Sequence, residues 1–356
     1  MTVSVSALDS SDISAECAVL ISQQTGEVIF KKNAYKHHSM ASTTKIMTSL
    51  LAAQSGKLHD EITVSKEMIL VEGTSMGLLP GDSVSLYELI YGMLLPSGND
   101  AANVTAYFLG GNVENFVKKM NAKAKEIGME NTNFVTPSGL DDEMHYSTAY
   151  DMALLGRYAV GDPVFRSVCS SKKASLSYGN PPYKRTLYNH NRLLESYKYA
   201  LGIKTGFTKK SGRCLVSYAE KDGTGLIAVT LNAPNDWNDH KLMLDYGFSK
   251  LKRYVFKPVI PEYMDVVGGN VEKFKISCEQ FEYDSLDHRN VIQKLVIDKF
   301  TYAPIKKGDK LGKVMLYLDG SYIGSTDICA AEDVGLLIQK QEKKSFFQRI
   351  KERFLK

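Results

Sequence analysis

Long apolar runs are missing from this chain of 356 residues. A helix that spans a membrane needs about 18 or more apolar residues in a row, and no stretch of that length occurs. Residues 1–16 also lack the basic start and the apolar core of a secretory signal peptide. We therefore expect no membrane-spanning helix, and an exported form of the protein would carry its signal outside this sequence.

Closely spaced cysteines are missing as well. The chain has no C-x-x-C motif, and its five cysteines are widely separated: Cys17, Cys169, Cys214, Cys278 and Cys329. Such spacing gives little support to a metal site or a redox motif. We expect isolated buried thiols, because free cysteine packs like a small hydrophobic residue.

A basic surface for nucleic acid is the third absence. The formal net charge is +4, but residues 340–356 hold seven basic and two acidic residues, hence +5, which leaves −1 for the rest. The excess of positive charge therefore belongs to the C-terminal tail, and the sequence predicts no nucleic-acid partner.

A serine and a lysine three positions apart, Ser42 and Lys45, lie at the start of a predicted helix. Residues at this spacing share a helix face, and a buried lysine can be neutral and accept the proton of a serine. S-x-x-K alone is a weak motif, because it occurs by chance in many helices. On the local sequence alone, the favoured interpretation is Ser42 as an N-cap with Lys45 in a solvated first turn.

Two companion motifs follow in the chain. An S-x-N motif occupies residues 97–99, after a helix that Pro96 ends, and a K-T-G motif occupies residues 204–206. The first of these alone fits ordinary turn chemistry. S-x-x-K, S-x-N and K-T-G in this order are the motif set of the penicillin-recognising serine enzymes. Together they make a nucleophilic serine the stronger interpretation.

The apolar patterns predict where these motifs lie. A hairpin is expected at 17–30 and helices at 42–51, 85–95, 113–127, 147–159 and 239–252. Strands at 201–207, 214–219 and 226–231 form an antiparallel meander, which the hairpin joins. The K-T-G motif falls on its edge strand, whose free N–H and C=O groups can pair with an extended peptide. Short alternating runs at 262–329 predict a second, β-rich domain.

These residues resemble a known family. Residues 25–27, 41–47, 94–102 and 202–208 closely resemble the low-molecular-weight penicillin-binding proteins, in the branch of the D-alanyl-D-alanine carboxypeptidases. The resemblance implies an α+β transpeptidase domain like that of β-lactamases, an all-β C-terminal domain and an amphipathic C-terminal helix. We expect the carboxypeptidase domain at 1–258, the β-rich domain at 259–335 and the tail at 336–356.

The resemblance also implies the chemistry. Ser42 would attack the carbonyl between the two terminal D-alanines of a peptidoglycan stem pentapeptide, and form an acyl-enzyme. Lys45 would be the general base, and Ser97 would relay a proton to the leaving D-alanine. Penicillins would acylate Ser42 and inhibit the enzyme. No metal and no organic cofactor is implied.

Further residues are implied to bind the substrate. Asn99 would orient the substrate amide, and Lys204, Thr205 and Gly206 would bind the end of the peptide. The oxyanion hole would consist of the backbone N–H groups of Ser42 and Phe207. Two departures stand out: some members have His at the position of Phe207, and many have an arginine near the substrate carboxylate, which residues 236–240 do not supply.

The tail at 341–356 predicts a membrane partner. Phe347, Ile350 and Phe354 recur at helical spacing, and the lysines and arginines lie mostly elsewhere. A basic amphipathic helix of this kind lies on an anionic membrane surface without spanning it. We expect an extracytoplasmic protein, peripheral on the outer face of a bacterial cytoplasmic membrane; a solvated helix is the alternative for the tail.

Three other functions compete with the carboxypeptidase. A D,D-endopeptidase acting on cross-links would use the same residues. A serine β-lactamase shares the motifs, but no E-x-x-L-N occurs between Ser97 and Lys204 to activate a hydrolytic water as in class A enzymes. A catalytically silent wall-binding scaffold would not need the intact motifs.

Overall fold

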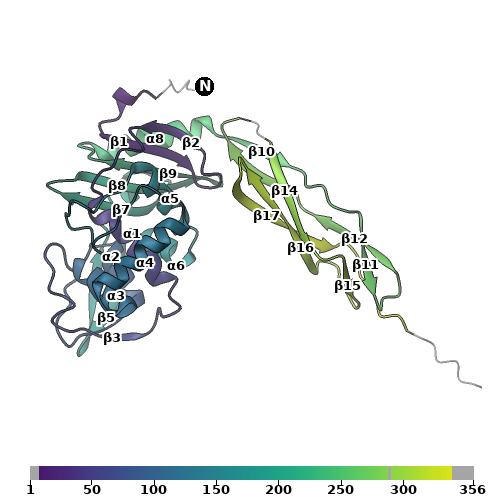
Figure 1. Ribbon diagram of the computed structural model, residues 1–356, viewed down its shortest axis with the longest axis horizontal. Helices are drawn as coiled ribbons and strands as arrows, with labels where there is room; N and C mark the ends of the chain where they lie inside the picture. Colours follow the sequence, from purple (N-terminus) through teal and green to yellow (C-terminus); the bar gives the residue numbers. More distant parts are fainter. Residues whose placement is uncertain (1–7, 288–289, 339–356) are drawn as a thin grey trace, which may run out of the picture. The chain divides into compact units, whose positions relative to one another are not determined.

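The computed structural model describes residues 8–287 and 290–338, which divide into two compact units (Figure 1). The first unit runs to Arg253 and takes in residues 284–287. The second holds Tyr254–Tyr283 and the described chain from residue 290 onward.

A five-stranded antiparallel sheet is the framework of the first unit, with the strand order β2-β1-β9-β8-β7. Its strands are β1 (Cys17–Ser22), β2 (Val28–Lys32), β7 (Ala200–Thr208), β8 (Gly212–Lys221) and β9 (Thr224–Leu231). The N-terminal hairpin joins the meander through β1 and β9, where Cys17 lies opposite Leu231. Both the meander and the place of the hairpin are as the sequence predicted.

Both faces of this sheet are covered (Figure 1). Cys17, Val19 and Ile21 of β1 pack into the core formed with the helical cluster, whereas Ala18 and Leu20 pack toward α8 (Asp236–Lys250). Alternate residues of a strand point to opposite faces. A strand that is buried on both faces therefore reads as an unbroken apolar run, as seen at 17–21.

The helical cluster lies on one face of the sheet and carries two of the three motifs (Figure 1). Ser85 and Glu88 form a capping box at the start of α2. The helices are α1 (Lys45–Ala53), α2 (Leu86–Leu94), α3 (Asn99–Gly110), α4 (Val113–Glu126), α5 (Ala149–Ala159) and α6 (Pro163–Cys169).

Shorter elements connect these layers. Two antiparallel strand pairs border the cluster: β3 (Glu61–Thr63) with β4 (Ser83–Ser85), and the hairpin of β5 (Lys173–Gly179) with β6 (Pro182–Tyr188). Single turns of helix are η1 (Ser10–Asp12), η2 (Ala41–Thr44) and α7 (Leu193–Ser196).

The second unit is the predicted all-β domain. Its six-stranded sheet has the order β14-β16-β17-β12-β11-β15 and a core of its own around Phe274, Val314 and Ile328. The strands are β11 (Tyr263–Val267), β12 (Lys273–Cys278), β14 (Val291–Ile297), β15 (Phe300–Tyr302), β16 (Lys310–Leu318) and β17 (Ser321–Ala330). In addition, β10 (Lys252–Phe256) pairs with β13 (Phe281–Ser285).

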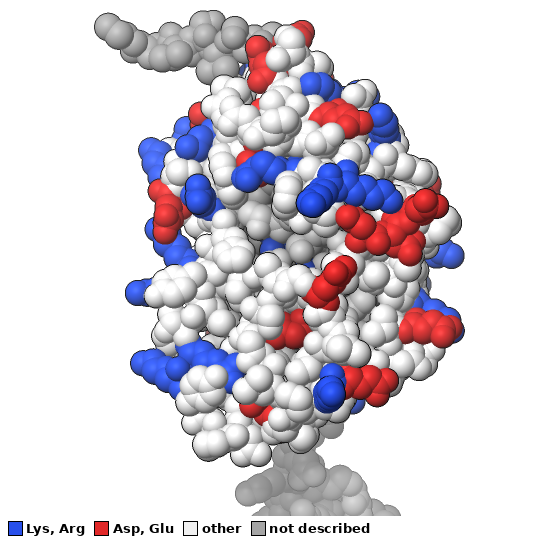
Figure 2. All heavy atoms as spheres, turned by 90° about the vertical axis from the view of Figure 1, so that its left-hand side faces the viewer, with Lys and Arg blue, Asp and Glu red and all other residues white. Residues whose placement is uncertain are grey.

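Further expectations concern a membrane-spanning helix, the cysteines, the surface charge and the tail. Within residues 8–287 and 290–338, no helix has the length and apolar character needed to cross a membrane. All five cysteines are free; Cys17, Cys169 and Cys214 are buried as expected, whereas Cys278 and Cys329 are half-buried. Figure 2 shows basic and acidic side chains interspersed over one face of the molecule. The amphipathic helix expected at 341–356 lies outside the described residues.

Candidate active site

A cavity of about 600 Å³ in the first unit brings the three sequence motifs together. Its lining includes Ser42 of the first motif, Ser97 and Asn99 of the second, and Thr205 and Gly206 of the third. The two motif lysines, Lys45 and Lys204, are buried. The cavity therefore contains the hydroxyl groups that the motifs predict.

The nucleophile candidate lies just before the helix and not on it. Ser42 belongs to the single turn η2, and α1 begins at Lys45. Lys45 Nζ lies 2.9 Å from Ser42 Oγ and donates to the carbonyl oxygen of Ser138 at 2.7 Å. Because Lys45 is fully buried, its interpretation as a lysine of a solvated first turn was wrong.

Burial changes the charge of Lys45. Loss of hydration lowers its pKa well below the ordinary value of a lysine; the charge of Lys204 lowers it further, and Asp100 opposes the shift. The lowered pKa favours the neutral amine over the ammonium form. The nitrogen at 2.9 Å can then accept the proton of the Ser42 hydroxyl.

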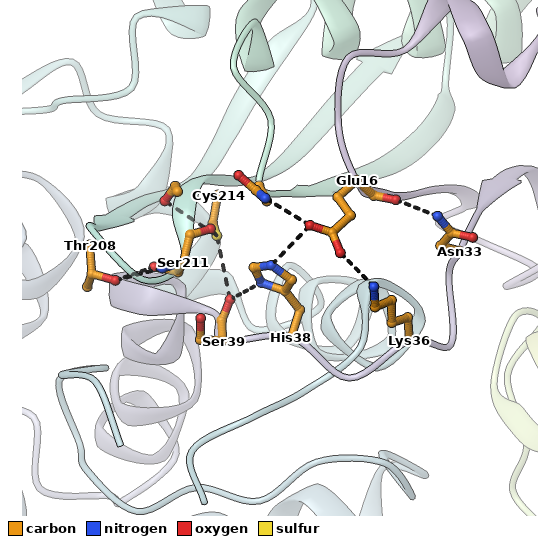
Figure 3. Close-up of polar contacts among 10 residues, drawn as sticks. Glu16, Asn33, Lys36, His38, Ser39, Thr208, Ser211 and Cys214 are labelled. Atoms are coloured by element: carbon orange, nitrogen blue, oxygen red, sulfur yellow. Dashed lines mark hydrogen bonds and ion pairs between the residues drawn. The ribbon is translucent and has the colours of Figure 1, made fainter. Parts of the chain in front are cut away.

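A polar network holds the chain segment that leads into Ser42 (Figure 3). The carbonyl oxygen of Ser39 accepts from His38 Nδ1 at 2.8 Å and from Cys214 Sγ on β8 at 3.8 Å. His38 Nε2 lies 3.7 Å from Glu16, which also pairs with Lys36 at 2.8 Å. The segment is thereby fixed to the sheet, and Ser42 follows it at a fixed place.

One glycine makes room for the strained backbone before Ser42. Ala41 has a φ of 47°, and Gly139 a φ of +88°. A Cβ atom on Gly139 would lie 1.9 Å from the carbonyl oxygen of Ala41, so no other residue fits there. Gly139 follows Ser138, whose carbonyl oxygen accepts a hydrogen bond from Lys45. The same loop therefore contacts both the backbone before Ser42 and the side chain of Lys45.

The S-x-N turn joins α2 to α3, and the buried carboxylate of Asp100 holds it in place. Asp100 accepts from the backbone N–H groups of Met76, Gly77 and Leu78 at 2.9–3.1 Å. Asn99 donates through Nδ2 to the carbonyl of Glu72 at 2.6 Å, and its buried Oδ1 has no hydrogen-bond partner within the described chain. An acceptor that is buried without a partner is costly unless a ligand supplies a donor.

The K-T-G motif lies on the edge strand β7, as predicted. Lys204 is buried; Nζ donates to the carbonyl oxygen of Thr205 at 2.9 Å, and loss of hydration lowers its pKa to about 7. A Cβ atom on Gly206 would lie 3.0 Å from the backbone nitrogen of Ser42, so glycine lets the strand approach Ser42 closely. Phe207 is 66% exposed beside the cavity.

The motifs did not reveal every residue of the cavity. His190 lines it, although this histidine has no partner at metal-ligand spacing in the sequence, and so do Arg192, Arg213, Asp236 and Trp237. The predicted meander could have pointed to Arg213, because it places the strand of Arg213 next to the strand of the K-T-G motif. In the observed register Arg213 on β8 pairs with Phe207, which follows that motif. Asp236 is its ion-pair partner.

His145 is a structural residue. It is buried, its Nε2 lies 2.8 Å from Thr44 Oγ1, and its Nδ1 accepts from the backbone N–H of Val135 at 2.9 Å. Burial lowers the pKa of His145 to about 4. The neutral ring thus connects the Ser42 turn to the loop that contains Ser138 and Gly139.

This arrangement defines the class of the protein. The site combines a serine hydroxyl hydrogen-bonded to a buried lysine, an S-x-N turn and a K-T-G edge strand. On an antiparallel sheet with a helical cluster, this combination is that of a penicillin-recognising serine enzyme. The family model of the D-alanyl-D-alanine carboxypeptidases, peptidase S11, matches residues 2–235, and that of the penicillin-binding protein 5 C-terminal domain matches residues 260–336. The chain belongs to the D-alanyl-D-alanine carboxypeptidase family of penicillin-binding proteins.

Two curated relatives and one solved structure match most of this chain. The chain is 35% identical over 339 residues to the D-alanyl-D-alanine carboxypeptidase DacF of Bacillus subtilis, with 90% of this chain and 86% of the relative covered. It is 31% identical over 368 residues to DacC of Escherichia coli, covering 96% and 88%. The crystal structure of penicillin-binding protein 5 from Haemophilus influenzae superimposes with a TM-score of 0.67 and 28% identity, over 92% of this chain and 100% of that one.

Proposed function

We propose that this serine-type carboxypeptidase removes the terminal D-alanine from peptidoglycan stem pentapeptides through an acyl-enzyme on Ser42. One observation carries the proposal: Lys45 Nζ, buried and with a lowered pKa, lies 2.9 Å from Ser42 Oγ at the wall of a cavity. Nucleophile and base already stand at hydrogen-bond distance, as general-base activation requires.

Acylation begins when Lys45 accepts the proton of Ser42. Ser42 Oγ then attacks the carbonyl carbon between the two D-alanines, and the carbonyl oxygen gains the negative charge. The backbone N–H groups of Ser42 and Phe207 form the oxyanion hole, where losing one donor typically costs about 3 kcal/mol. The close approach of Gly206 to the Ser42 nitrogen supports this geometry.

The C–N bond then breaks. Ser97 relays a proton to the amine of the leaving D-alanine, and water attacks the ester carbonyl to release the shortened peptide and free Ser42. Asn99 binds the substrate amide through its unpartnered Oδ1. Lys204 and Thr205 bind the terminal carboxylate, on a strand whose outer edge is open to an extended peptide.

Two assays test this function together. The protein is incubated with penicillin and its mass is measured, while D-alanine release from a D-Ala-D-Ala pentapeptide is followed without the drug. We expect a stable adduct on Ser42, release of D-alanine, and loss of both in S42A. Rapid turnover of penicillin without peptide cleavage would assign a β-lactamase, and cleavage of cross-linked dimers in preference to pentapeptides would assign an endopeptidase.

The place of the enzyme belongs to the same proposal. Residues 1–258 form the catalytic domain, 259–335 the β-rich domain, and 336–356 a tail that attaches the protein to the outer face of the bacterial cytoplasmic membrane. The excess of basic residues in the tail supports this attachment, since each cation contributes about 1 kcal/mol near an anionic surface. Sedimentation with vesicles tests it: binding to anionic but not to neutral vesicles is expected, and equal binding would contradict it.

A further inference from the structure

A half-exposed guanidinium lies at the wall of the cavity, on the strand next to the K-T-G motif. Arg213 on β8 pairs with Phe207 on β7, two residues along the strand from Thr205. Arg213, Thr205 and Ser42 line the same cavity. The side chain of Arg213 is 42% exposed. It is therefore open to a ligand at the end of the strand that the peptide is proposed to pair with.

A buried carboxylate orients this guanidinium. Asp236, at the first position of α8, has a side chain that is 3% exposed. It accepts from Arg213 Nε at 3.0 Å and from Nη2 at 2.8 and 3.0 Å. The Trp237 ring lies 5.5 Å from the guanidinium carbon. Within the described chain Nη1 has no hydrogen-bond partner, so one edge of a fixed fork remains available.

The motif lysines are less suited to hold an anion on their own. Lys45 is buried and its pKa is lowered well below the ordinary value. Burial lowers the pKa of Lys204 to about 7, so its charge is partial near neutral pH. A guanidinium stays charged at every pH at which the enzyme works. Arg213 is thus a permanent cation at this wall of the cavity.

We propose that Arg213 binds the terminal carboxylate of the peptide substrate and that Asp236 is the positioning residue that orients it. This inference rests on the proposed carboxypeptidase function. It gives the enzyme its preference for a free C-terminus: a peptide that ends in an amide lacks the negative charge that the guanidinium recognises. Arg213 comes from β8, outside the three motifs, and Asp236 comes from the start of α8.

The competing explanation is purely structural. The pair of Arg213 and Asp236 also ties β8 to the start of α8. If that were its whole role, removing it would weaken the fold and lower the cleavage of every substrate by a similar factor. The ratio between a substrate with a free carboxylate and its C-terminal amide separates the two explanations, because that ratio is independent of the amount of folded enzyme.

The experiment compares R213Q with the wild type on an acylated L-Lys-D-Ala-D-Ala tripeptide and on the amide of the same peptide. A charge-assisted hydrogen bond that is lost costs a factor of about 10 to 100. We expect kcat/KM for the free acid to fall by about that factor and kcat/KM for the amide to change less than about threefold. D236N, which keeps the guanidinium but loosens it, should lower the acid-to-amide ratio by a smaller factor.

The chain supplies a matched control. Arg166 also pairs with a carboxylate, Glu220, at 2.6 Å, and its guanidinium carbon lies 5.2 Å from the ring of Tyr218. It does not line the cavity. R166Q removes the same kind of ion pair from the same unit and should leave the acid-to-amide ratio unchanged. R213K, which retains a charge without the fork, serves as the second variant if R213Q does not fold, and should keep part of the preference.

The outcomes separate this inference from the function on which it rests. An unchanged acid-to-amide ratio in R213Q and R213K, or equal losses on both substrates, overturns the role of Arg213 while carboxypeptidase activity stands. A wild type that forms a penicillin adduct but releases no D-alanine from either peptide overturns the proposed function, and this inference with it. A ratio that falls in R213Q and stays constant in R166Q supports the assignment.

Discussion

The side-chain nitrogen of Lys45 lies 2.9 Å from the hydroxyl oxygen of Ser42, and the lysine is completely buried. Burial of a lysine is unfavourable for folding, because it favours the neutral form and removes hydration. The same burial lowers the pKa of the lysine and so favours the neutral form, which the proposed role as general base requires. Burial of Lys45 therefore lowers the stability of the fold and at the same time favours the amine form that can accept the proton of the Ser42 hydroxyl.

Replacing Lys45 by methionine should separate these two effects. K45M fills a similar volume without a charge, so we expect a melting temperature equal to or above that of the wild type. Loss of the general base should slow acylation of Ser42 by penicillin by about a thousandfold. Adduct formation followed by mass spectrometry, together with thermal unfolding, checks both. K118M, at a lysine whose side chain is 68% exposed, is the control and should acylate normally.

Much of the fold follows from local patterns in the sequence. The strands at 201–231 were predictable because short apolar runs alternate with turn residues, and the capping box at Ser85 depends on two side chains three residues apart. The edge position of the K-T-G strand followed from the meander. The family resemblance then supplied the roles of the motif residues.

Other features of the site depend on contacts between distant segments. Lys45 is buried partly because it reaches the carbonyl of Ser138, 93 residues away in the chain. Asp236 meets Arg213 because α8 begins beside β8. A motif search near residues 236–240 does not reveal this contact. Ser42 falls in η2 and not in α1, and helix boundaries are the least predictable part of a pattern.

The lowered pKa of Lys204 predicts how stability depends on pH. In the folded protein this pKa is about 7, against 10.5 for an ordinary lysine. Between these values the unfolded chain binds a proton that the folded protein does not, so the free energy of unfolding rises with pH by at most about 1.4 kcal/mol per unit. Below pH 7 both forms hold the proton, and this contribution no longer changes.

The variant K204M should lack this slope. We expect the free energy of unfolding of the wild type, measured with urea, to rise by about 2 to 3 kcal/mol relative to K204M between about pH 7.5 and about pH 9.5. Taking the difference between the two proteins cancels the titration of the groups that do not interact with Lys204; Lys45, whose pKa the charge of Lys204 lowers, is the one motif residue that does not cancel. Parallel pH profiles would mean that Lys204 keeps an ordinary pKa in the folded protein.

Asp100 should matter for stability and activity together. Its buried carboxylate receives three backbone N–H groups of residues 76–78 and the hydroxyl of Ser75. An amide in D100N can accept at one atom only, so we expect a loss of about 2 to 4 kcal/mol in the free energy of unfolding. The adjacent S-x-N turn should shift, and acylation by penicillin should slow. E114Q, at the exposed pair with Lys118, should change neither; a stable and active D100N would refute this role.

Gly139 offers a test in which conformation and contact can be separated. Its φ is +88°, and a Cβ atom there would lie 1.9 Å from the carbonyl oxygen of Ala41. Gly111 has a similar φ of +76°, but a Cβ atom there meets nothing within 4 Å. G111A should therefore cost only the left-handed conformation, about 1 kcal/mol, and leave acylation unchanged. G139A has the same conformational cost and must in addition displace Ala41, next to Ser42.

We expect G139A to unfold at a clearly lower urea concentration than G111A and to form little penicillin adduct even where it is fully folded. Equal stability and equal acylation of the two variants would show that the loop at Gly139 does not set the position of the nucleophile.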